Sequence, residues 1–340
     1  MEKKILTVGV IGFGLSGRYL IIPYLMVNKN FKVKTVVQHS SDTASKIFPS
    51  VQTTHSVEEM LSDKEIDLVI ISSPNTTHFD YAKKSLLAGK HVLIEKPMCS
   101  TVEEAEKLIA LAKKKEKVLS VYQNRRFDGC FKTVLKIIKS GVLGDIFNVE
   151  LRFDRWRPEP NPKKWKEIPA LGTGILYDLG AHVIDQSLCL FGVPNKFDGV
   201  VESQRPGSQI DDAFDIRLYY DKLTVTLKSS MLVREPTPRF VLHGTNGSFV
   251  KFGVDPQEDM LKAGMTPDMP GFGEDTPEFY GTLFIELHGL EFQGKIKTLK
   301  GDFGALFQNL YEAIVEGKDL IVKPEIVVEQ IRIMEGIKMK

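Results

Sequence analysis

The chain has 340 residues, 42% of them apolar and 26% charged, with 45 lysines and arginines against 44 aspartates and glutamates. These values are ordinary for a globular protein long enough to form two domains, and they exclude a disordered or fibrous chain. The formal charge of +1 creates no field that would attract nucleic acid or an anionic membrane, so neither is an expected partner.

The chain lacks the usual signs of a secreted or membrane-bound protein. Its three cysteines, Cys99, Cys130 and Cys189, are odd in number and lack C-x-x-C spacing, which argues against a disulfide framework and a zinc site. No segment approaches the roughly 18 apolar residues of a membrane span. The first residues lead into a glycine-rich turn without a long apolar region. We therefore expect the protein to be cytoplasmic.

The first third of the chain alternates apolar, β-branched runs with helical patterns. Capping boxes, Ser56-x-x-Glu59 and Thr101-x-x-Glu104, open two of the predicted helices, and Pro23 predicts a kink or a missing hydrogen bond in the first. Strands are predicted at 5–11, 33–37, 68–71, 92–94 and 118–121, and helices at 18–27, 57–61, 79–87 and 102–115. Strict succession of strand and helix is typical of a doubly wound parallel sheet, so we expect an α/β domain over residues 1–124.

The pattern changes after about residue 126, where runs that alternate apolar and polar residues become dominant. The Asn246-Gly247 pair is a hairpin turn signal, so this sheet should be largely antiparallel. Strands are predicted at 147–153, 200–203, 214–219, 223–231, 240–252 and 284–299, and helices at 131–139, 305–316 and 325–338. Residues 125–340 should therefore form a separate α+β domain with a large, mainly antiparallel open sheet. The loop 255–278, rich in Pro, Gly and Met, is either a lid or an oligomer arm.

A glycine-rich hexapeptide follows the first predicted strand and opens the first predicted helix. In that context glycines allow a tight turn, let the backbone approach a pyrophosphate and permit close helix packing, while the helix amino terminus attracts the anion. The motif alone is weak because it occurs by chance, but its position predicts dinucleotide binding. Its residues are Gly12, Phe13, Gly14, Leu15, Ser16 and Gly17.

The end of the second predicted strand bears on which dinucleotide is bound. NAD-binding domains usually place Asp or Glu there to hold the ribose 2′-hydroxyl, whereas this chain has Gln38, His39 and Ser40. These donors can bind a 2′-phosphate and no carboxylate stands there to repel one, although Asp42 follows closely and the usual arginine is absent. We expect NADP in preference to NAD; alternatively, His39 is a solvated loop residue.

Two further segments follow predicted strands, at the edge where doubly wound sheets bind ligands. They are "SSPNTTH" at 72–78 and "IEKPM" at 94–98. An ammonium at Lys96 beside a nicotinamide ring can hydrogen-bond the oxygen of the carbon that exchanges hydride; the alternative is an ordinary surface lysine. Pro97 makes a cis bond possible. The expected cofactor contacts are Ser73, Pro74, Asn75, His78, Glu95 and Lys96.

Together these motifs resemble the Gfo/Idh/MocA superfamily, named after glucose–fructose oxidoreductase, inositol dehydrogenase and a rhizopine-catabolism protein. The matching stretches cover nearly the whole chain, and "RWRPEP" and "PEFYGTL" look close to the bacterial NADP-linked scyllo-inositol 2-dehydrogenase subgroup. In order, the stretches are "GFGLSG", "SSPNTTH", "HVLIEKPM", "SVYQNRRFD" and "GTGILYDLGAHVIDQSLCLFG". The resemblance implies a nicotinamide-dependent dehydrogenase of a cyclic polyol or sugar, which usually assembles through its second-domain sheet into a homodimer or homotetramer.

The predicted helix at 172–185 carries an acid and an imidazole among apolar residues. A buried stripe that includes Leu176 and Val183 turns Asp178 and His182 to another side, where both can reach one site. Taken alone, a helical histidine is more often structural, and such a pair can be a local hydrogen bond. In the resemblance they match the family's acid and histidine, as Lys96 matches its lysine. We therefore expect Lys96, Asp178 and His182 to be catalytic, without a metal, because no second histidine lies at ligand spacing.

In the expected reaction hydride passes from a carbinol carbon to NADP⁺ while His182 takes the hydroxyl proton, a task that suits an imidazole with its ordinary pKa near 6.5. Lys96 would hold the reacting oxygen, and Asp178 would orient the imidazole or bind a neighbouring hydroxyl. Three other functions stay open: a dinucleotide-binding regulator, a glycosidase with tightly held NAD, and a reductase of another sugar or small carbonyl compound. Substrate contacts are expected from Tyr122, Asn124, Arg155, Trp156 and Arg157, although Trp156 and Trp165 can equally be packing residues.

Overall fold

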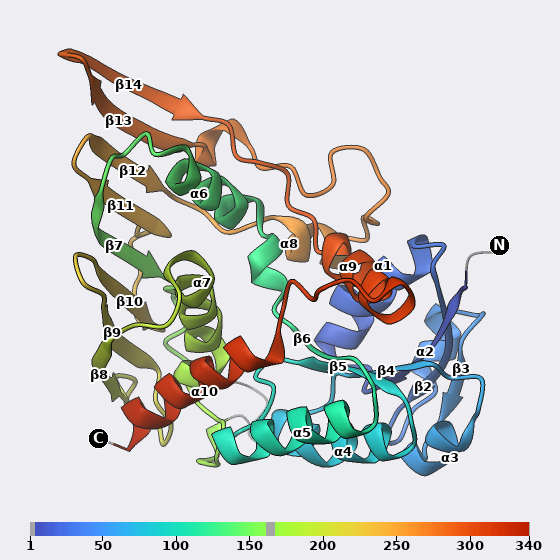
Figure 1. The fold of residues 1–340 in the computed structure, drawn as a ribbon. Coiled ribbons are helices and arrows are strands. Elements are labelled where there is room, and N and C mark those ends of the chain that lie inside the picture. The colour runs from blue at the N-terminus through green and yellow to red at the C-terminus, as the bar shows by residue number, and fades with distance from the viewer. Residues whose placement is uncertain (1–3, 161–166, 340) are drawn as a thin grey trace. The chain divides into compact units, whose positions relative to one another are not determined.

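The computed structural model describes residues 4–160 and 167–339, and it divides into two compact units (Figure 1). Unit 1 contains residues 1–124, 257–272 and 302–328, and unit 2 contains residues 125–256, 273–301 and 329–340. Two segments from late in the chain therefore belong to unit 1. Trp165, considered above as a packing residue, lies outside the described residues.

Unit 1 is built on a six-stranded parallel sheet. Its strands are β1 Leu6–Ile11, β2 Phe31–Val37, β3 Gln52–Thr54, β4 Leu68–Ile71, β5 His91–Glu95 and β6 Leu119–Tyr122. Their order across the sheet is β3-β2-β1-β4-β5-β6, so the chain winds outward in both directions from β1 and the doubly wound prediction is confirmed. All of β4 is buried, as expected of a strand covered on both faces. The carboxyl ends of β1 and β4 mark the edge where such sheets bind ligands.

Helices flank this sheet, and α4 and α5 lie side by side on one of its faces (Figure 1). The helices of unit 1 are α1 Ile22–Val27, α2 Thr43–Ile47, α3 Val57–Ser62, α4 His78–Leu87, α5 Val102–Lys114, α8 Gln257–Lys262 and α9 Gly304–Glu316. Both predicted N-caps are formed, whereas the glutamates of the two boxes bond other groups, Glu59 the Thr54 hydroxyl and Glu104 the Ser100 N–H. The hydroxyl of Ser56 accepts from the Glu59 N–H at 3.1 Å, and that of Thr101 from the Glu104 N–H at 3.2 Å.

The helix after β1 is interrupted near Pro23. A π-helix, Ser16–Ile21, comes first, and α1 begins at Ile22 with Pro23 in its opening turn. The two helices follow one another without a gap, since the Ile22 N–H donates to the Gly17 oxygen of the π-helix, and Pro23 has no N–H to continue this pattern. The predicted irregularity is confirmed, and the chain accommodates it by ending one helix and beginning another.

An aromatic cluster holds the late segments in unit 1. The Tyr24 ring of α1 lies 6.1 Å from that of Phe272, 5.9 Å from that of Phe303 and 6.0 Å from that of Phe307. Gln257 adds polar links, since its Oε1 accepts from the Tyr24 hydroxyl at 2.9 Å and from the Phe303 N–H at 2.8 Å. The first part of the loop 255–278 is therefore a short helix, α8, followed by a buried anchor at Phe272.

Unit 2 is built on an eight-stranded sheet in the order β14-β13-β12-β11-β7-β10-β9-β8. Its strands are β7 Ile146–Arg152, β8 Lys196–Glu202, β9 Ala213–Tyr219, β10 Thr224–Ser230, β11 Phe240–Gly244, β12 Gly247–Lys251, β13 Gly281–Leu287 and β14 Leu290–Ile296. Neighbouring strands are antiparallel except for the parallel pair β7 and β10. The prediction of a mainly antiparallel sheet is confirmed.

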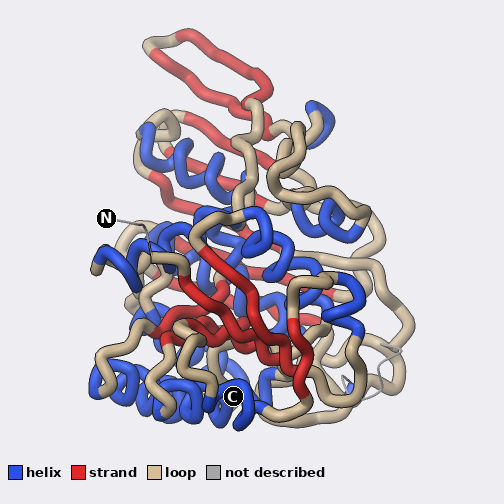
Figure 2. The backbone as a smooth tube through the Cα atoms, turned by 90° about the vertical axis from the view of Figure 1, so that its right-hand side faces the viewer, coloured by secondary structure: helices blue, strands red, loops and turns tan. Residues whose placement is uncertain are grey.

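Two of the predicted strands are hairpins. The run 240–252 turns at Thr245 and Asn246, where the Asn-Gly signal lies. The prediction of a single strand over 284–299 was wrong. These residues form two strands, β13 and β14, which pair through a turn at His288 and Gly289, both with positive φ. His-Gly is not among the common hairpin dipeptides, so the alternating pattern hid this turn. The β13–β14 hairpin extends beyond the other strands of its sheet (Figure 2).

Helices cover one face of the second sheet. These are α6 Gly129–Ser140, α7 Ala181–Phe191 and the part of α10 Pro324–Lys338 that belongs to unit 2 (Figure 1). Strand β7 shows the resulting alternation, because Val149 and Leu151 are fully buried whereas Glu150 and Arg152 point to the other face and are half-buried. Within residues 4–160 and 167–339, no helix is long and apolar enough to cross a membrane.

Candidate active site

The glycine-rich loop after β1 needs its glycines for different reasons. Gly12 has φ +98°, and a Cβ there would lie 2.8 Å from the Ser72 carbonyl oxygen, while a Cβ at Gly17 would lie 2.5 Å from the Gly12 oxygen. Close packing of the loop on the residue after β4 explains both. A Cβ at Gly14, in contrast, would meet no described atom within 4 Å. The fold itself does not demand glycine at 14, and close approach of a pyrophosphate to the backbone does. The loop therefore fits a dinucleotide.

The segment after β2 is organised by Gln38. Its Nε2 donates to the hydroxyls of Ser41 and Thr43, each at 2.9 Å, and its Oε1 accepts from the Ala44 N–H at 2.7 Å. The Gln38 side chain is 8% exposed, whereas His39 is exposed, as is Ser40 beside it. The structure thus places Gln38 inside its own loop and the next two residues at the surface, where they can reach a ligand.

His78 joins the two loops that follow β4 and β5. Its Nδ1 lies 2.8 Å from the Pro97 carbonyl oxygen and its Nε2 lies 3.0 Å from that of Ser73. The imidazole is 1% exposed, and this burial lowers the pKa of His78. His78 therefore ties the loop of Ser73 and Asn75 to the Lys96–Pro97 bond, which is cis. His78 therefore has a structural position beneath the loops that it joins, whereas Pro74 of the same segment is exposed.

Glu95 links the glycine-rich loop to the lysine. One carboxylate oxygen accepts from the Ser16 hydroxyl, and the other accepts from the Lys96 N–H at 2.7 Å. Ser72 adds a further link, because its hydroxyl donates to the Gly12 oxygen at 2.9 Å. The predicted cofactor residues after β1, β4 and β5 thus lie in loops that are bonded to one another at one edge of the sheet, and half-buried Lys96 is among them.

The Asp178 and His182 pair lies where a π-helix, Leu176–Gly180, passes into α7. The apolar residues predicted as a stripe, Leu176, Leu179, Val183 and Leu188, are all buried. Asp178 is exposed and His182 is 6% exposed. The π-turn was not predicted, because its apolar spacing is that of an ordinary helix. Such turns recur at functional sites, and the Ser16–Ile21 segment of the cofactor loop is another.

Three arginine side chains lie close to Phe153, whose ring is next to that of His182. The Phe153 ring lies 6.3 Å from the His182 ring, and the guanidinium carbons of Arg239, Arg155 and Arg125 lie 4.0, 5.3 and 5.7 Å from its centroid. Burial lowers the pKa of Arg239 to about 10, which still leaves it charged at neutral pH. Such a setting favours negative charge that develops on a substrate oxygen. Sequence reasoning missed Phe153 and Arg239, which carry no motif signal.

Asp185, one turn after His182, has a different role from the pair. Both its oxygens accept from Arg126, with Nε to Oδ2 at 2.8 Å and Nη2 to Oδ1 at 2.6 Å, and both residues are buried. Gln186 donates to the Arg125 carbonyl oxygen at 3.0 Å. These bonds anchor α7 to the start of unit 2.

The predicted substrate contacts are divided between the two units. Tyr122 is fully buried in unit 1, where its hydroxyl donates to the Leu20 oxygen at 2.5 Å, and Asn124 is 4% exposed. In unit 2, Arg155 is half-buried on Phe153. Trp156 is 48% exposed with the Arg234 guanidinium 5.4 Å from its ring centroid, and Arg157 is exposed.

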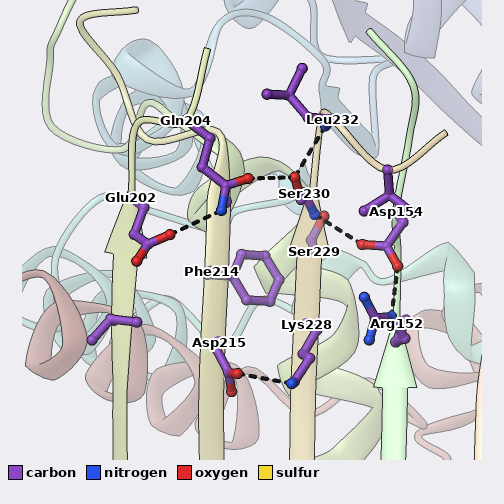
Figure 3. Close-up of a pocket in the computed structure, with 13 residues that line it drawn as sticks. Arg152, Asp154, Glu202, Gln204, Phe214, Asp215, Lys228, Ser229, Ser230 and Leu232 are labelled. Carbon is purple, nitrogen blue, oxygen red and sulfur yellow. Dashed lines mark hydrogen bonds and ion pairs between the residues drawn. The ribbon is translucent and has the colours of Figure 1, made fainter. Parts of the chain in front are cut away.

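A polar cavity of about 450 Å³ lies on the other face of the second sheet (Figure 3). Four of its charged groups form two pairs, Lys228 with Asp215 at 3.0 Å and Arg152 with Asp154 at 2.7 Å, and Glu202 accepts from the Gln204 amide at 2.9 Å. None of the predicted site residues lines this cavity. We therefore separate it from the candidate active site.

A doubly wound sheet with this glycine-rich loop at its carboxyl edge defines a dinucleotide-binding protein. Comparison with known proteins defines the family. Residues 6–123 match the model of the oxidoreductase family's NAD-binding Rossmann fold, and residues 136–339 match the model of its C-terminal alpha/beta domain. The chain belongs to this family of oxidoreductases, Gfo/Idh/MocA, as the motifs indicated.

Among individual relatives, some are similar over nearly their whole length and others over about half of it. Scyllo-inositol 2-dehydrogenase (NADP(+)) IolW of Bacillus subtilis is 38% identical over 97% of this chain and 92% of its own. The solved structure of the oxidoreductase yvaA from Bacillus subtilis is 36% identical, with a TM-score of 0.96 over 100% of this chain and 97% of that one. Levoglucosan dehydrogenase of Pseudarthrobacter phenanthrenivorans is 28% identical over 59% of this chain and 55% of its own.

Proposed function

We propose that the protein is a dehydrogenase that interconverts a secondary alcohol of a cyclic polyol or sugar, of the scyllo-inositol type, and its ketone. The observation that carries the proposal is the similarity to scyllo-inositol 2-dehydrogenase over 97% of the chain. The stretches that hold Lys96, Asp178 and His182 are intact in this chain, which supports catalysis over a purely regulatory role.

NADP is the proposed cofactor. Exposed His39 and Ser40 at the end of β2 offer donors to a 2′-phosphate. The open space at Gly14 accommodates the pyrophosphate. The NADP linkage of the scyllo-inositol 2-dehydrogenase from Bacillus subtilis supports the same preference.

In the proposed mechanism His182 accepts the proton of the reacting hydroxyl as general base. Bound NADP⁺ supplies the hydride acceptor. The Lys96 ammonium donates a hydrogen bond to the same substrate oxygen and stabilises the charge that develops there. Asp178 orients the His182 imidazole or holds a neighbouring hydroxyl. In the reducing direction protonated His182 returns the proton.

Substrate hydroxyls are proposed to contact Arg155 and Trp156, which are accessible on unit 2. Assembly as a homodimer or homotetramer is proposed through the face of the second sheet that α6, α7 and α10 do not cover. Large apolar side chains are exposed there, with Val200 at 55% and Phe284 at 41%, and this supports the proposal. The cytoplasm is the proposed location, since the described cysteines are free thiols.

The test is reduction of NADP⁺ or NAD⁺ by purified protein with scyllo-inositol, myo-inositol, levoglucosan and common aldoses. His182→Asn should abolish turnover because the base is lost. His288→Asn, at the tip of the β13–β14 hairpin, is the matched control and should retain full activity, since asparagine tolerates its positive φ.

Turnover of scyllo-inositol with NADP⁺, lost only in the first variant, supports the proposal. Cofactor binding without turnover of any polyol or matching ketone contradicts it and favours a regulator. Full activity of His182→Asn contradicts the assigned base.

A further inference from the structure

Asp211 sits beside the start of the helix that carries Asp178 and His182. It is 6% exposed and precedes β9. Its Oδ2 accepts from the Leu176 N–H at 2.9 Å, and its backbone oxygen accepts from the Ile175 N–H at 2.9 Å. The first N–H groups of a helix have no partner within it. One residue from elsewhere in the chain therefore supplies acceptors to two of them.

The loop before this helix is shaped around the same carboxylate. Gly174 has φ +96°, and a Cβ there would lie 2.1 Å from Oδ1 of Asp211. The Gly174 oxygen in turn accepts from the Asp178 N–H at 3.0 Å. Asp211 is thus hydrogen-bonded to Ile175 and Leu176, and the residue just before them, Gly174, is hydrogen-bonded to the backbone of Asp178.

The second oxygen of Asp211 pairs with a residue of the last helix. Lys338 in α10 donates from its ammonium to Oδ1, and its side chain is 35% exposed. The carboxylate is therefore held from both sides, by the helix start and by α10. Its negative charge also contributes, after burial and together with Glu335, to raising the pKa of Tyr177 to about 12.

We propose that Asp211 is a positioning residue for the reaction proposed above, on which this inference rests. By fixing the first turn of the π-helix, Asp211 sets the place of the Asp178 carboxylate. In this role Asp211 acts through its bonds to Ile175 and Leu176 and not through contact with cofactor or substrate.

The neighbouring Asp212 provides a matched control. It is 1% exposed, but its carboxylate holds the N–H of Gln204 at 2.7 Å and the Nε of Arg205 at 2.9 Å rather than the helix. Loss of either carboxylate should lower stability, whereas only loss of Asp211 should disturb Asp178.

The test is a double-mutant cycle on turnover per folded protein. Asp211→Ala should lower kcat by roughly 10- to 100-fold, as expected for a misplaced catalytic group, and leave the KM for NADP⁺ unchanged. Asp211→Asn keeps an oxygen acceptor for Leu176 and should lose less. Asp211→Ala combined with Asp178→Asn should be no slower than Asp178→Asn alone, whereas Asp212→Ala combined with Asp178→Asn should show the product of the two single effects.

Two results would overturn the inference: effects of Asp211→Ala and Asp178→Asn on kcat that multiply, or a kcat of Asp211→Ala within about twofold of wild type. In either case a low kcat of Asp178→Asn still supports the proposed function. If Asp178→Asn leaves kcat unchanged, both the proposed role of Asp178 and this inference are wrong. Amide hydrogen exchange across 175–182 reads the same effect without substrate. Faster exchange in Asp211→Ala than in Asp212→Ala is the expected result and shows, independently of turnover, that Asp211 fixes this helix start; equal exchange overturns the inference.

Discussion

Replacement of Gly14 by alanine should separate cofactor binding from folding. A Cβ at this position meets no described atom within 4 Å, so the folded chain has room for it. Removing a glycine also reduces the freedom of the unfolded chain, which is worth about 0.4–1 kcal/mol where the backbone is compatible. Without cofactor, Gly14→Ala should therefore unfold at the same urea concentration as wild type or slightly above it.

Binding should respond in the opposite direction, because the added methyl group stands where the pyrophosphate approaches the backbone. We expect the Kd for NADP⁺ to rise at least about tenfold, which is about 1.4 kcal/mol. At a cofactor concentration of 100 times the wild-type Kd, binding stabilises the wild type by about 2.7 kcal/mol and would stabilise the variant by only about 1.4 kcal/mol. Urea denaturation with and without NADP⁺ measures both quantities.

Gly12→Ala is the contrasting variant. Its positive φ and the contact at 2.8 Å with the Ser72 oxygen predict a loss of at least about 1–2 kcal/mol before any cofactor is added. The reasoning is refuted if Gly14→Ala binds NADP⁺ as tightly as wild type, or if it loses more than about 1 kcal/mol without cofactor.

Three further outcomes are expected. Arg126→Met should lower the free energy of unfolding by about 3–5 kcal/mol in urea, because it leaves buried Asp185 unpaired, and Arg126→Met with Asp185→Leu should recover part of that loss. Burial lowers the pKa of His91 to about 4, and its Nδ1 accepts from the Val118 N–H at 3.0 Å. In the unfolded chain the His91 imidazole is protonated below about pH 6.5. The contribution of neutral His91 to the free energy of unfolding should therefore be full above about pH 6.5 and decrease between about pH 6.5 and 4, and thermal melting should show a smaller decrease in His91→Gln. His39→Asp should lower the ratio of kcat/KM for NADP⁺ over NAD⁺ by at least about tenfold, because a carboxylate repels the 2′-phosphate; an unchanged ratio would remove His39 from the cofactor site.

Much of the fold could be predicted because its signals are local. Apolar runs and capping boxes depend on nearby residues, and the parallel sheet of unit 1 follows from them. The β13–β14 hairpin was missed because its turn uses His288 in a left-handed conformation that the residue pattern does not announce. The packing of residues 257–272 in unit 1 could not be predicted either, since Phe272 and Gln257 find their partners far away in the chain.

The candidate site also contains residues that could be predicted from local motifs and residues that could not. The glycines, Lys96, Asp178 and His182 lie in recognisable motifs, whereas the groups that support them do not. Nothing in the local sequence of Asp211 connects it with the helix start at Leu176, which lies 35 residues earlier. Such support depends on tertiary contacts, which a single sequence does not display.

The discontinuity of unit 1 has a consequence for the order of folding during synthesis. The aromatic ring of Tyr24 is covered by Phe272, Phe303 and Phe307, which leave the ribosome only after most of unit 2. Although an amino-terminal domain usually folds first, this one must wait with part of its core uncovered. A nascent chain arrested after residue 124 should therefore be sensitive to protease, and protection should appear only once residues 302–328 have emerged.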